Sequence, residues 1–314
     1  AIQMSRPYID SRLNDAILQT GTVLCVGIDP HPDIMPPVFG GTGENLASGQ
    51  ALAHLRVFSK TVMPAATGRV PAIKPQAALF EAYGPGGMEI LAELSCNARQ
   101  AGLLVIMDAK RGDIGSTARA YAAGWLGAEA AFASDALTIN PYLGMDSLEP
   151  FFARAAETAS GLFVLVRTSN KGSADIQQQL VSGKDATNIP LYAHIANCLA
   201  PYIQAAIDPA SGLSDIGIVA GATGPEEAEK LRALLPAAPF LIPGYGAQGA
   251  SAKQACAGLI RHRMGHLTGG LVNASRAITH NSAVQDAKTT EQAEQAMIAA
   301  IEIAGAELAS ILPV

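Results

Sequence analysis

The chain has 314 residues, of which 49% are hydrophobic and 15% are charged, with a formal net charge of −6 at pH 7. This composition excludes intrinsic disorder, which needs low hydrophobicity and high charge, and the acidic balance excludes a global basic surface for nucleic acid. The apolar stretches are far shorter than the ~20 residues of a membrane-spanning helix, so we expect a soluble protein with neither nucleic-acid nor membrane partners.

The cysteines and the N-terminal residues favour a reducing compartment. Cys25, Cys96, Cys198 and Cys256 lie far apart, without the short spacing of a zinc site. Cys25 lies inside an apolar run and is expected to be a buried thiol. No cationic segment followed by an apolar core begins the sequence, so no secretory signal is visible. We expect a cytoplasmic protein without a bound metal.

Eight short apolar runs alternate with longer Ala-rich stretches along the chain. Most runs are continuous rather than alternating, which is typical of strands buried on both faces. In chain order the predicted strands are Val23–Ile28, Val70–Ile73, Leu103–Met107, Ala136–Ile139, Leu162–Val166, Ile216–Ala220, Phe240–Ile242 and Gly270–Val272. The stretches with helix formers and mixed faces are Gln50–Thr67, Met88–Gln100, Ser116–Leu126, Asp146–Thr158, Tyr192–Ala206, Pro225–Leu235 and Glu291–Ile311.

Strand–helix alternation repeated eight times over ~250–300 residues is the pattern of an α/β protein with a (β/α)8 TIM barrel. A doubly wound sheet is the alternative, because the count does not prove closure. We predict a single barrel domain over residues 1–314. The polar, Gly-rich segments Gly40–Gly49 and Lys171–Asn188 are predicted to be surface excursions from it.

Charged residues end the first three predicted strands. Asp29 follows the first strand, and Lys74 ends the second strand just before Pro75, which favours extended geometry at that lysine. The third strand runs directly into Asp108 and Lys110. The carboxyl ends of barrel strands form the active site of such barrels, so this pattern predicts a site built around these charges.

The third strand carries the strongest signal. Strand periodicity places Asp108 and Lys110 on the same side, and Asp113 follows beyond the turn that Gly112 permits. A lysine held between two carboxylates stays protonated, because nearby negative charge favours its cationic form. Lys110 is therefore predicted to be a proton donor rather than a neutral nucleophile.

The last two predicted strands indicate a phosphate site. The seventh runs into a Gly-rich segment from Pro243 to Gly249, whose backbone N–H groups can approach a ligand closely. The eighth ends at Ser275 and Arg276, and arginine offers a planar fork suited to phosphate oxygens. Barrels commonly hold phosphate with the loops after strands seven and eight.

These residues match a known family. The run from Asp108 to Thr117, with Lys74 on the second strand, closely resembles orotidine 5′-monophosphate decarboxylase, and its continuation through Ala118 is similar to the longer bacterial subfamily. The resemblance extends from Asp29 to Arg276. The aspartate–lysine–aspartate motif alone is shared across a superfamily, whereas Lys74, Gln248 and Arg276 together make the match specific.

The resemblance implies a cofactor-free enzyme that decarboxylates orotidine 5′-monophosphate to UMP, the last step of de novo pyrimidine nucleotide biosynthesis. It implies that Asp29 binds the ribose hydroxyls with Lys74 beside them. Asp108 would lie against the substrate carboxylate, and Lys110 would protonate pyrimidine C6 as carbon dioxide leaves. These expectations come from the family rather than from the spacing of the residues.

The resemblance also implies a homodimer and the remaining contacts. Asp113, with Ile114 and Thr117, would reach into the site of the partner subunit. Ser169 would bind the pyrimidine ring. The 5′-phosphate would be held by Gln248, Arg276 and the amides of Gly246 and Ser275, and Pro243 would also bind the substrate. One departure is Lys171, which stands where family members often have a proline that stiffens the loop after Ser169.

Three alternatives remain. A magnesium-dependent sugar-phosphate decarboxylase or synthase of the same superfamily needs an acidic metal ligand on the second strand, where Lys74 would repel a divalent ion. A Schiff-base aldolase using Lys74 or Lys110 needs a desolvated, neutral lysine, whereas the flanking Asp108 and Asp113 favour the charged form. A non-catalytic phosphate-binding barrel would leave the charges at three strand ends unexplained.

Overall fold

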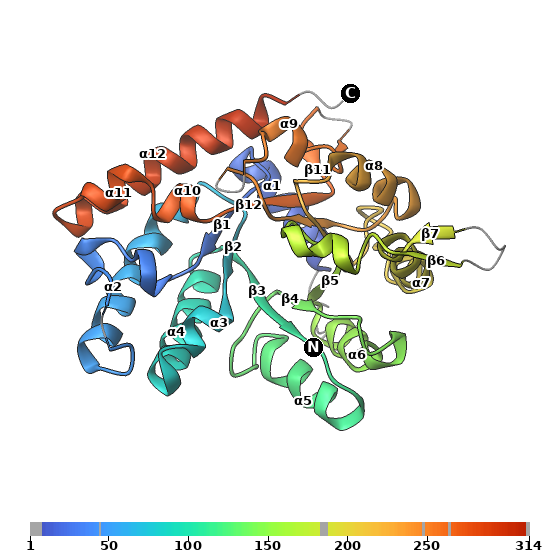
Figure 1. Ribbon diagram of the computed structural model, residues 1–314, viewed down its shortest axis with the longest axis horizontal. Helices are drawn as coiled ribbons and strands as arrows, with labels where there is room; N and C mark the ends of the chain where they lie inside the picture. The colour runs from blue at the N-terminus through green and yellow to red at the C-terminus, as the bar shows by residue number, and fades with distance from the viewer. Residues whose placement is uncertain (1–7, 44, 183–187, 247–248, 263–264, 312–314) are drawn as a thin grey trace, which may run out of the picture.

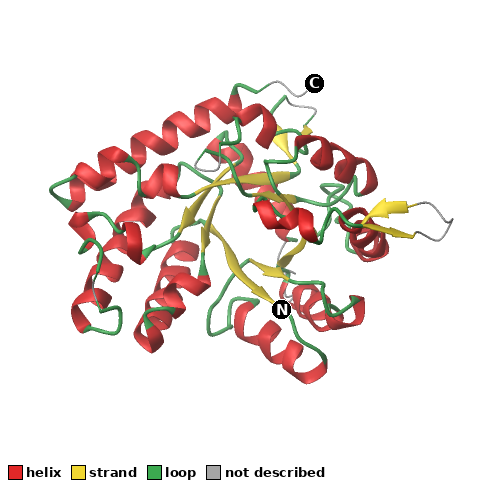
Figure 2. Ribbon diagram, in the orientation of Figure 1, coloured by secondary structure: helices red, strands yellow, loops and turns green. Residues whose placement is uncertain are grey.

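The computed structural model describes residues 8–311 except 44, 183–187, 247–248 and 263–264. Eight parallel strands close into a barrel in the order β1-β12-β9-β8-β5-β4-β3-β2, so the barrel prediction is confirmed and the doubly wound alternative is wrong. Each predicted strand corresponds to one barrel strand (Figure 2). The barrel strands are β1 (Leu24–Ile28), β2 (Ala72–Pro75), β3 (Leu104–Arg111), β4 (Ala136–Ile139), β5 (Gly161–Arg167), β8 (Ile216–Ala220), β9 (Phe240–Ile242) and β12 (Gly270–Ala274).

The predicted helices form a layer around the barrel (Figure 1). They are α2 (Gly49–Ala66), α4 (Gly84–Gln100), α5 (Gly115–Trp125), α6 (Glu149–Thr158), α7 (Leu191–Ala205), α8 (Pro225–Leu234) and α12 (Thr290–Ala309). Shorter helices follow several strands: α3 (Ala77–Glu81), α9 (Ala252–Ala255), α10 (Arg276–Thr279) and α11 (Ser282–Asp286). Because α-helices cover the outer face, the barrel strands are buried on both sides, which explains their continuous apolar sequence.

The core is continuous from the barrel interior to the helix layer. β1, β2, β4, β8, β9 and β12 are buried along their whole length. Cys25 in β1 is a buried free thiol, as expected, and burial raises its pKa to about 12. Within the described residues, no helix is long and apolar enough to cross a membrane.

A helix that the sequence analysis did not predict, α1 (Ile9–Thr20), packs against the amino ends of the barrel strands. Its backbone N–H at Ile9 donates to Asp215 just before β8, at 3.1 Å, and Arg12 pairs with Asp135 just before β4, at 2.7 Å. Leu13 and other apolar residues of this helix are buried. Helix α1 therefore covers the amino end of the barrel and leaves the carboxyl ends of the strands for a site.

Two antiparallel hairpins complete the fold. β6 (Leu180–Ser182) pairs with β7 (Asn188–Pro190), and β10 (Ile260–Arg261) pairs with β11 (Leu267–Thr268). The first hairpin extends away from the barrel at the right of Figure 1. The described part of the segment Lys171–Asn188 is thus a surface excursion, as expected, made of a 3₁₀ turn η4 (Lys171–Asp175) and this hairpin.

Candidate active site

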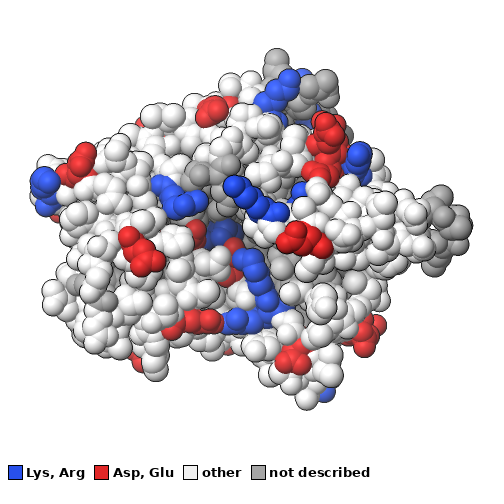
Figure 3. Space-filling view, in the orientation of Figure 1, with Lys and Arg blue, Asp and Glu red and all other residues white. Residues whose placement is uncertain are grey.

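A cavity of about 710 Å³ lies where the barrel strands end. Figure 3 shows a hollow near the middle of this face with acidic and basic side chains around it. The predicted site residues that line the cavity are Asp29, Lys74, Asp108, Lys110, Ser169, Pro243, Ser275 and Arg276. They come from the ends of β1, β2, β3, β5, β9 and β12. The structure therefore brings these distant segments together at one place.

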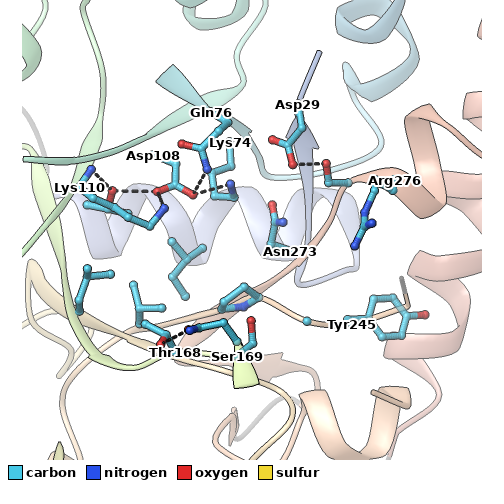
Figure 4. Close-up of a pocket in the computed structure, with 18 of the residues that line it drawn as sticks. Asp29, Lys74, Gln76, Asp108, Lys110, Thr168, Ser169, Tyr245, Asn273 and Arg276 are labelled. Carbon is cyan, nitrogen blue, oxygen red and sulfur yellow. Dashed lines mark hydrogen bonds and ion pairs between the residues drawn. The ribbon is translucent and has the colours of Figure 1, made fainter. Parts of the chain in front are cut away.

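Two ammonium groups contact one carboxylate at the centre of the cavity. Lys74 Nζ lies 2.7 Å from Asp108 Oδ2, and Lys110 Nζ lies 2.6 Å from Asp108 Oδ1. Gln76 Nε2 also donates to Oδ2, at 3.2 Å. Figure 4 shows Lys110, Asp108 and Lys74 next to one another along one wall. A buried carboxylate with several charge-assisted donors is held in one orientation.

Burial and pairing set the charges of this cluster. Burial alone would raise the pKa of Asp108, but the neighbouring Lys74 and Lys110 outweigh it and hold that pKa well below its usual range. Burial alone would lower the pKa of Lys74, but Asp108 and Asp29 outweigh it and raise that pKa. At neutral pH, Asp108 is therefore an anion and Lys74 a cation, as the mutual attraction of opposite charges requires.

Asp108 and Lys110 do meet, but not through a regular strand. Lys110 has a φ of 47°, in the left-handed region, so the alternating pleat does not continue through it. Its backbone N–H donates to the hydroxyl of Thr138 on β4, at 2.9 Å. The contact between Lys110 and Asp108 that strand periodicity predicted is therefore present. It arises from the left-handed backbone at Lys110 and not from a regular extended strand.

Unsatisfied polar atoms lie beside this cluster, toward Arg276. The hydroxyl of Ser275 donates to Asp29 Oδ2, whereas Asp29 Oδ1 and Asn273 Oδ1 are buried and accept no hydrogen bond from the described part of the chain. Figure 4 places Asp29 and Asn273 between Lys74 and Arg276. Buried acceptors in a cavity wall can be satisfied by hydroxyl donors of a ligand.

Arg276 lies at the opposite end of the cavity from Lys110 (Figure 4). It is the first residue of α10, directly after β12, and its side chain is exposed. Pro243, Gly244 and Tyr245, after β9, also line the cavity, and Figure 4 shows Tyr245 on the same side of the view as Arg276. Gly246 lines a neighbouring, mostly apolar cavity instead, and Gln248 lies outside the described residues.

The three predicted site residues that follow β3 are also not brought to this cavity by their own chain. Asp113, Ile114 and Thr117 are not among its described lining residues. The Asp113 carboxylate accepts the backbone N–H of Ile114 at 2.7 Å, and Ile114 is 61% exposed. Among the described residues of one chain, Lys110 therefore forms an ion pair with one carboxylate, Asp108, rather than lying between two.

The loop after Ser169 is stabilised without the family's proline. Gln177 Oε1 accepts the backbone N–H of Thr168, and Gln177 Nε2 donates to the hydroxyl of the same threonine, both at 2.8 Å. The guanidinium of Arg167 donates to the Thr168 carbonyl at 2.8 Å and also to the hydroxyl of Ser173. These contacts tie the loop containing Lys171 to the end of β5.

Several cavity residues were missed by the sequence analysis. Gln76 could have been found, because it lies two positions after Lys74 at the end of a strand. Thr138 and Asn273 lie inside or at the end of apolar runs, where a single polar residue gives no distinct signal. Gln177 lies in a polar segment that resembles any surface loop.

Comparisons with known proteins agree with this arrangement. The family described as "Orotidine 5′-phosphate decarboxylase / HUMPS family" matches residues 22–292. The orotidine 5′-phosphate decarboxylase of Rhodopirellula baltica is 43% identical over 273 residues, which cover 85% of this chain and 87% of that protein. The Deinococcus radiodurans enzyme of the same name is 39% identical over 279 residues, covering 87% and 90%. The structure of Leishmania donovani OMP decarboxylase superposes with a TM-score of 0.67 at 31% identity, covering 95% of this chain and 98% of that one.

Proposed function

The chain belongs to the orotidine 5′-phosphate decarboxylase / HUMPS family, and from this premise we propose how it converts orotidine 5′-monophosphate to UMP and carbon dioxide. One observation carries the proposal. The buried carboxylate of Asp108 pairs with the ammonium groups of Lys74 and Lys110 at one end of a cavity whose other end holds Arg276. This arrangement matches a substrate with an anionic reacting end and an anionic phosphate.

The charges orient the substrate in the cavity. Arg276 binds the 5′-phosphate through its planar fork, together with Ser275 and Gln248, and Pro243 lines the same cavity. Asp29, whose Oδ1 is buried and unsatisfied within the described chain, accepts hydrogen bonds from the ribose hydroxyls, with Lys74 beside it. Ser169 contacts the pyrimidine ring. The carboxylate on C6 then lies beside Asp108 and Lys110.

The reaction needs no electron sink other than the site itself. The bond between C6 and the carboxylate breaks, carbon dioxide leaves, and the electron pair stays on C6. Asp108 repels the substrate carboxylate in the ground state, and the Lys110 ammonium stabilises the negative charge that develops on C6. Lys110 then transfers a proton to C6, which gives UMP. The neutral amine regains its proton from water.

Phosphate binding can contribute to the rate although it is remote from C6. Binding energy from a non-reacting part of a substrate can hold the reacting part in a productive position. The two ends of the cavity come from different strands of the closed barrel, because Lys110 lies on β3 and Arg276 follows β12. We therefore expect the phosphate to position the pyrimidine as well as to hold it.

The site residues absent from the cavity support a homodimer. Asp113, Ile114 and Thr117 lie outside their own chain's cavity, and Ile114 is strongly exposed for an isoleucine. We propose that this segment enters the site of a second copy of the chain, where Asp113 provides the second carboxylate beside Lys110. One catalytic domain per chain then yields two shared sites per dimer. The cytoplasmic location remains a prediction from the sequence.

The charges of Lys74 and Asp108 disfavour both alternative enzymes, the magnesium-dependent sugar-phosphate enzyme and the Schiff-base aldolase. The position where a metal-dependent relative needs an acidic ligand holds the Lys74 ammonium, 2.7 Å from Asp108. Among the described residues, no group of three or more His, Cys, Asp or Glu side chains could hold a metal ion. Lys74 has a raised pKa, so it is a poor amine nucleophile for a Schiff base.

The test is an absorbance assay of purified protein with orotidine 5′-monophosphate, run with EDTA, with borohydride and without either. We expect the substrate to be consumed at the same rate in all three. Loss of activity with EDTA would favour the metal-dependent enzyme, and a reduced covalent adduct would favour the Schiff base. No turnover of this substrate under any condition would overturn the proposed function.

A further inference from the structure

Strand β3 bulges at the reacting end of the cavity. Its register with β4 pairs Met107 with Leu137 and then Arg111 with Ile139, so three residues of β3 face one residue of β4, Thr138. A bulge next to an active site re-aims the side chains that it carries. Here it carries both Asp108 and Lys110.

The bulge leaves Lys110 in an unfavourable backbone conformation. Its φ of 47° is in the left-handed region, where a residue with a Cβ is destabilised unless its surroundings compensate. The regular hydrogen bonds between β3 and β4 are interrupted at the same point. A buried backbone N–H without a partner would add a further cost.

One hydroxyl group supplies the missing partner. The backbone N–H of Lys110 donates to Thr138 Oγ1 at 2.9 Å, and Thr138 Oγ1 donates to Asp108 Oδ1 at 3.0 Å. A hydroxyl has one proton, and a backbone N–H can only donate, so the Thr138 proton must point toward Asp108. Thr138 is 1% exposed, so the described contacts of its hydroxyl lie almost entirely within the protein.

We propose that Thr138 is a positioning residue for the decarboxylation, because a single hydroxyl fixes the Lys110 backbone and the Asp108 carboxylate relative to each other. The inference rests on the proposed function. Asp108 Oδ1 is shared between this hydroxyl and the Lys110 ammonium, and Oδ2 between Lys74 and Gln76. Without Thr138, Asp108 Oδ1 loses the neutral donor that it has among the described residues.

The consequence is a change in the rate of the chemical step rather than in binding. Arg276, Asp29 and Ser169, which hold the phosphate, ribose and base in the proposed function, make no contact with Thr138 among the hydrogen bonds of the described residues. A displaced Lys110 ammonium, in contrast, misses both the developing charge and the protonation site on C6. An error of about 1 Å in such a position can lower a rate by ~10²-fold.

The experiment compares Thr138→Val, which keeps the shape and removes the hydroxyl, with Thr138→Ser, which keeps the hydroxyl. We expect Thr138→Val to lower kcat about 10- to 100-fold, the range for loss of one hydrogen bond to a charged group, with KM and the Kd for UMP within about threefold of wild type. Thr138→Ser should restore kcat to within about threefold of wild type. If Thr138→Val does not fold, Thr138→Cys replaces it, since a thiol is only a weak donor and acceptor.

A matched control is Thr61→Val. Thr61 is also buried, and its hydroxyl donates to the Val57 carbonyl within α2, at 2.9 Å, far from the cavity in the fold. This variant removes a buried hydroxyl that no cavity residue contacts, so kcat should stay unchanged. If wild type is active and Thr138→Val is equally active, the inference is wrong and the proposed function stands. The same holds if Thr138→Ser is as slow as Thr138→Val. An inactive wild type would overturn the proposed function and the inference together.

Discussion

At the scale of single residues, Asp108 controls the arrangement of the site. Its two oxygens accept hydrogen bonds from Lys74, Gln76, Lys110 and Thr138. Removing one partner of a buried ion pair typically costs 3–5 kcal/mol, because the remaining charge is left uncompensated. The same pairs that keep Asp108 ionised therefore also keep Lys74 and Lys110 in place for the substrate.

Arg276→Ala should weaken the binding of UMP by about 10- to 100-fold or more. The guanidinium makes charge-assisted hydrogen bonds to phosphate in the proposed function, and each is worth roughly 1.5–3 kcal/mol. Calorimetric titration with UMP measures the effect. Arg56→Ala is the control, because Arg56 pairs with Glu93 between two outer helices. An Arg276→Ala variant that binds UMP as tightly as wild type would show that the phosphate site is misplaced.

The sequence predicted the charged members of the site because charge directly after a buried strand is unusual. It did not predict Thr138, whose hydroxyl is small enough to lie in an apolar run and is indistinguishable there from a core residue. Nor did it predict that Lys110 leaves the extended conformation, because that depends on the register between β3 and β4. Local sequence patterns therefore identify the charged residues at strand ends, whereas hydrogen bonds between strands determine how those residues are arranged.

At the scale of elements, the barrel strands were predictable and α1 was not. Burial on both faces imposes a continuous apolar run on each strand, and that signal is local. Helix α1 depends on partners about two hundred residues away, since Asp215 accepts the backbone N–H of Ile9 at its first turn. Its own sequence has mean hydropathy near neutral and gives little sign of where it packs.

Asp215→Asn should change how stability depends on pH. Burial, followed by the neighbouring Asp10, raises the pKa of Asp215 to about 8. An unfolded aspartate ionises near 3.9, so between about pH 4 and 8 the folded state binds more protons, and wild-type stability falls as pH rises. The asparagine can still accept the Ile9 N–H and has no such dependence. The free energy of unfolding, measured with urea, should therefore fall between pH 5 and pH 9 more for wild type than for Asp215→Asn.

The control for that measurement is Asp15→Asn, an exposed carboxylate on the same helix. Its free energy of unfolding should follow that of wild type at both pH values. A constant difference in stability between Asp215→Asn and wild type from pH 5 to pH 9 would contradict the raised pKa. In that case the carboxylates beneath the barrel would be ionised in the folded protein at neutral pH.

At the scale of the whole molecule, the barrel has one covered end and one open end. Helix α1 packs on the amino end, and the cavity lies at the carboxyl end, where β3 leads into α5. The residues after that strand, half-buried Asp113 and exposed Ile114 and Thr117, are directed by the proposed function into a second chain. Activity should then belong to the dimer rather than to the single barrel.

Mixing two inactive variants tests this sharing. In a two-fold symmetric dimer of Lys110→Ala with Asp113→Asn, one site carries both substitutions and the other carries neither. Random exchange makes half of the dimers mixed, so roughly a quarter of all sites become intact and activity should recover to about that fraction. Each variant alone should be nearly inactive. Unchanged activity after confirmed subunit exchange would show that both residues serve the same chain's site.

The turnover of Lys110→Ala tests most directly the claim that this cluster performs the decarboxylation. Proton transfer contributes ~10²–10⁴-fold and charge stabilisation ~10²–10³-fold, so the rate of orotidine 5′-monophosphate consumption should fall by more than about 10⁴-fold. UMP binding should persist, and Lys60→Ala, at an exposed position on α2, should keep full activity. A Lys110→Ala variant that binds UMP and turns over substrate within tenfold of wild type would contradict the account.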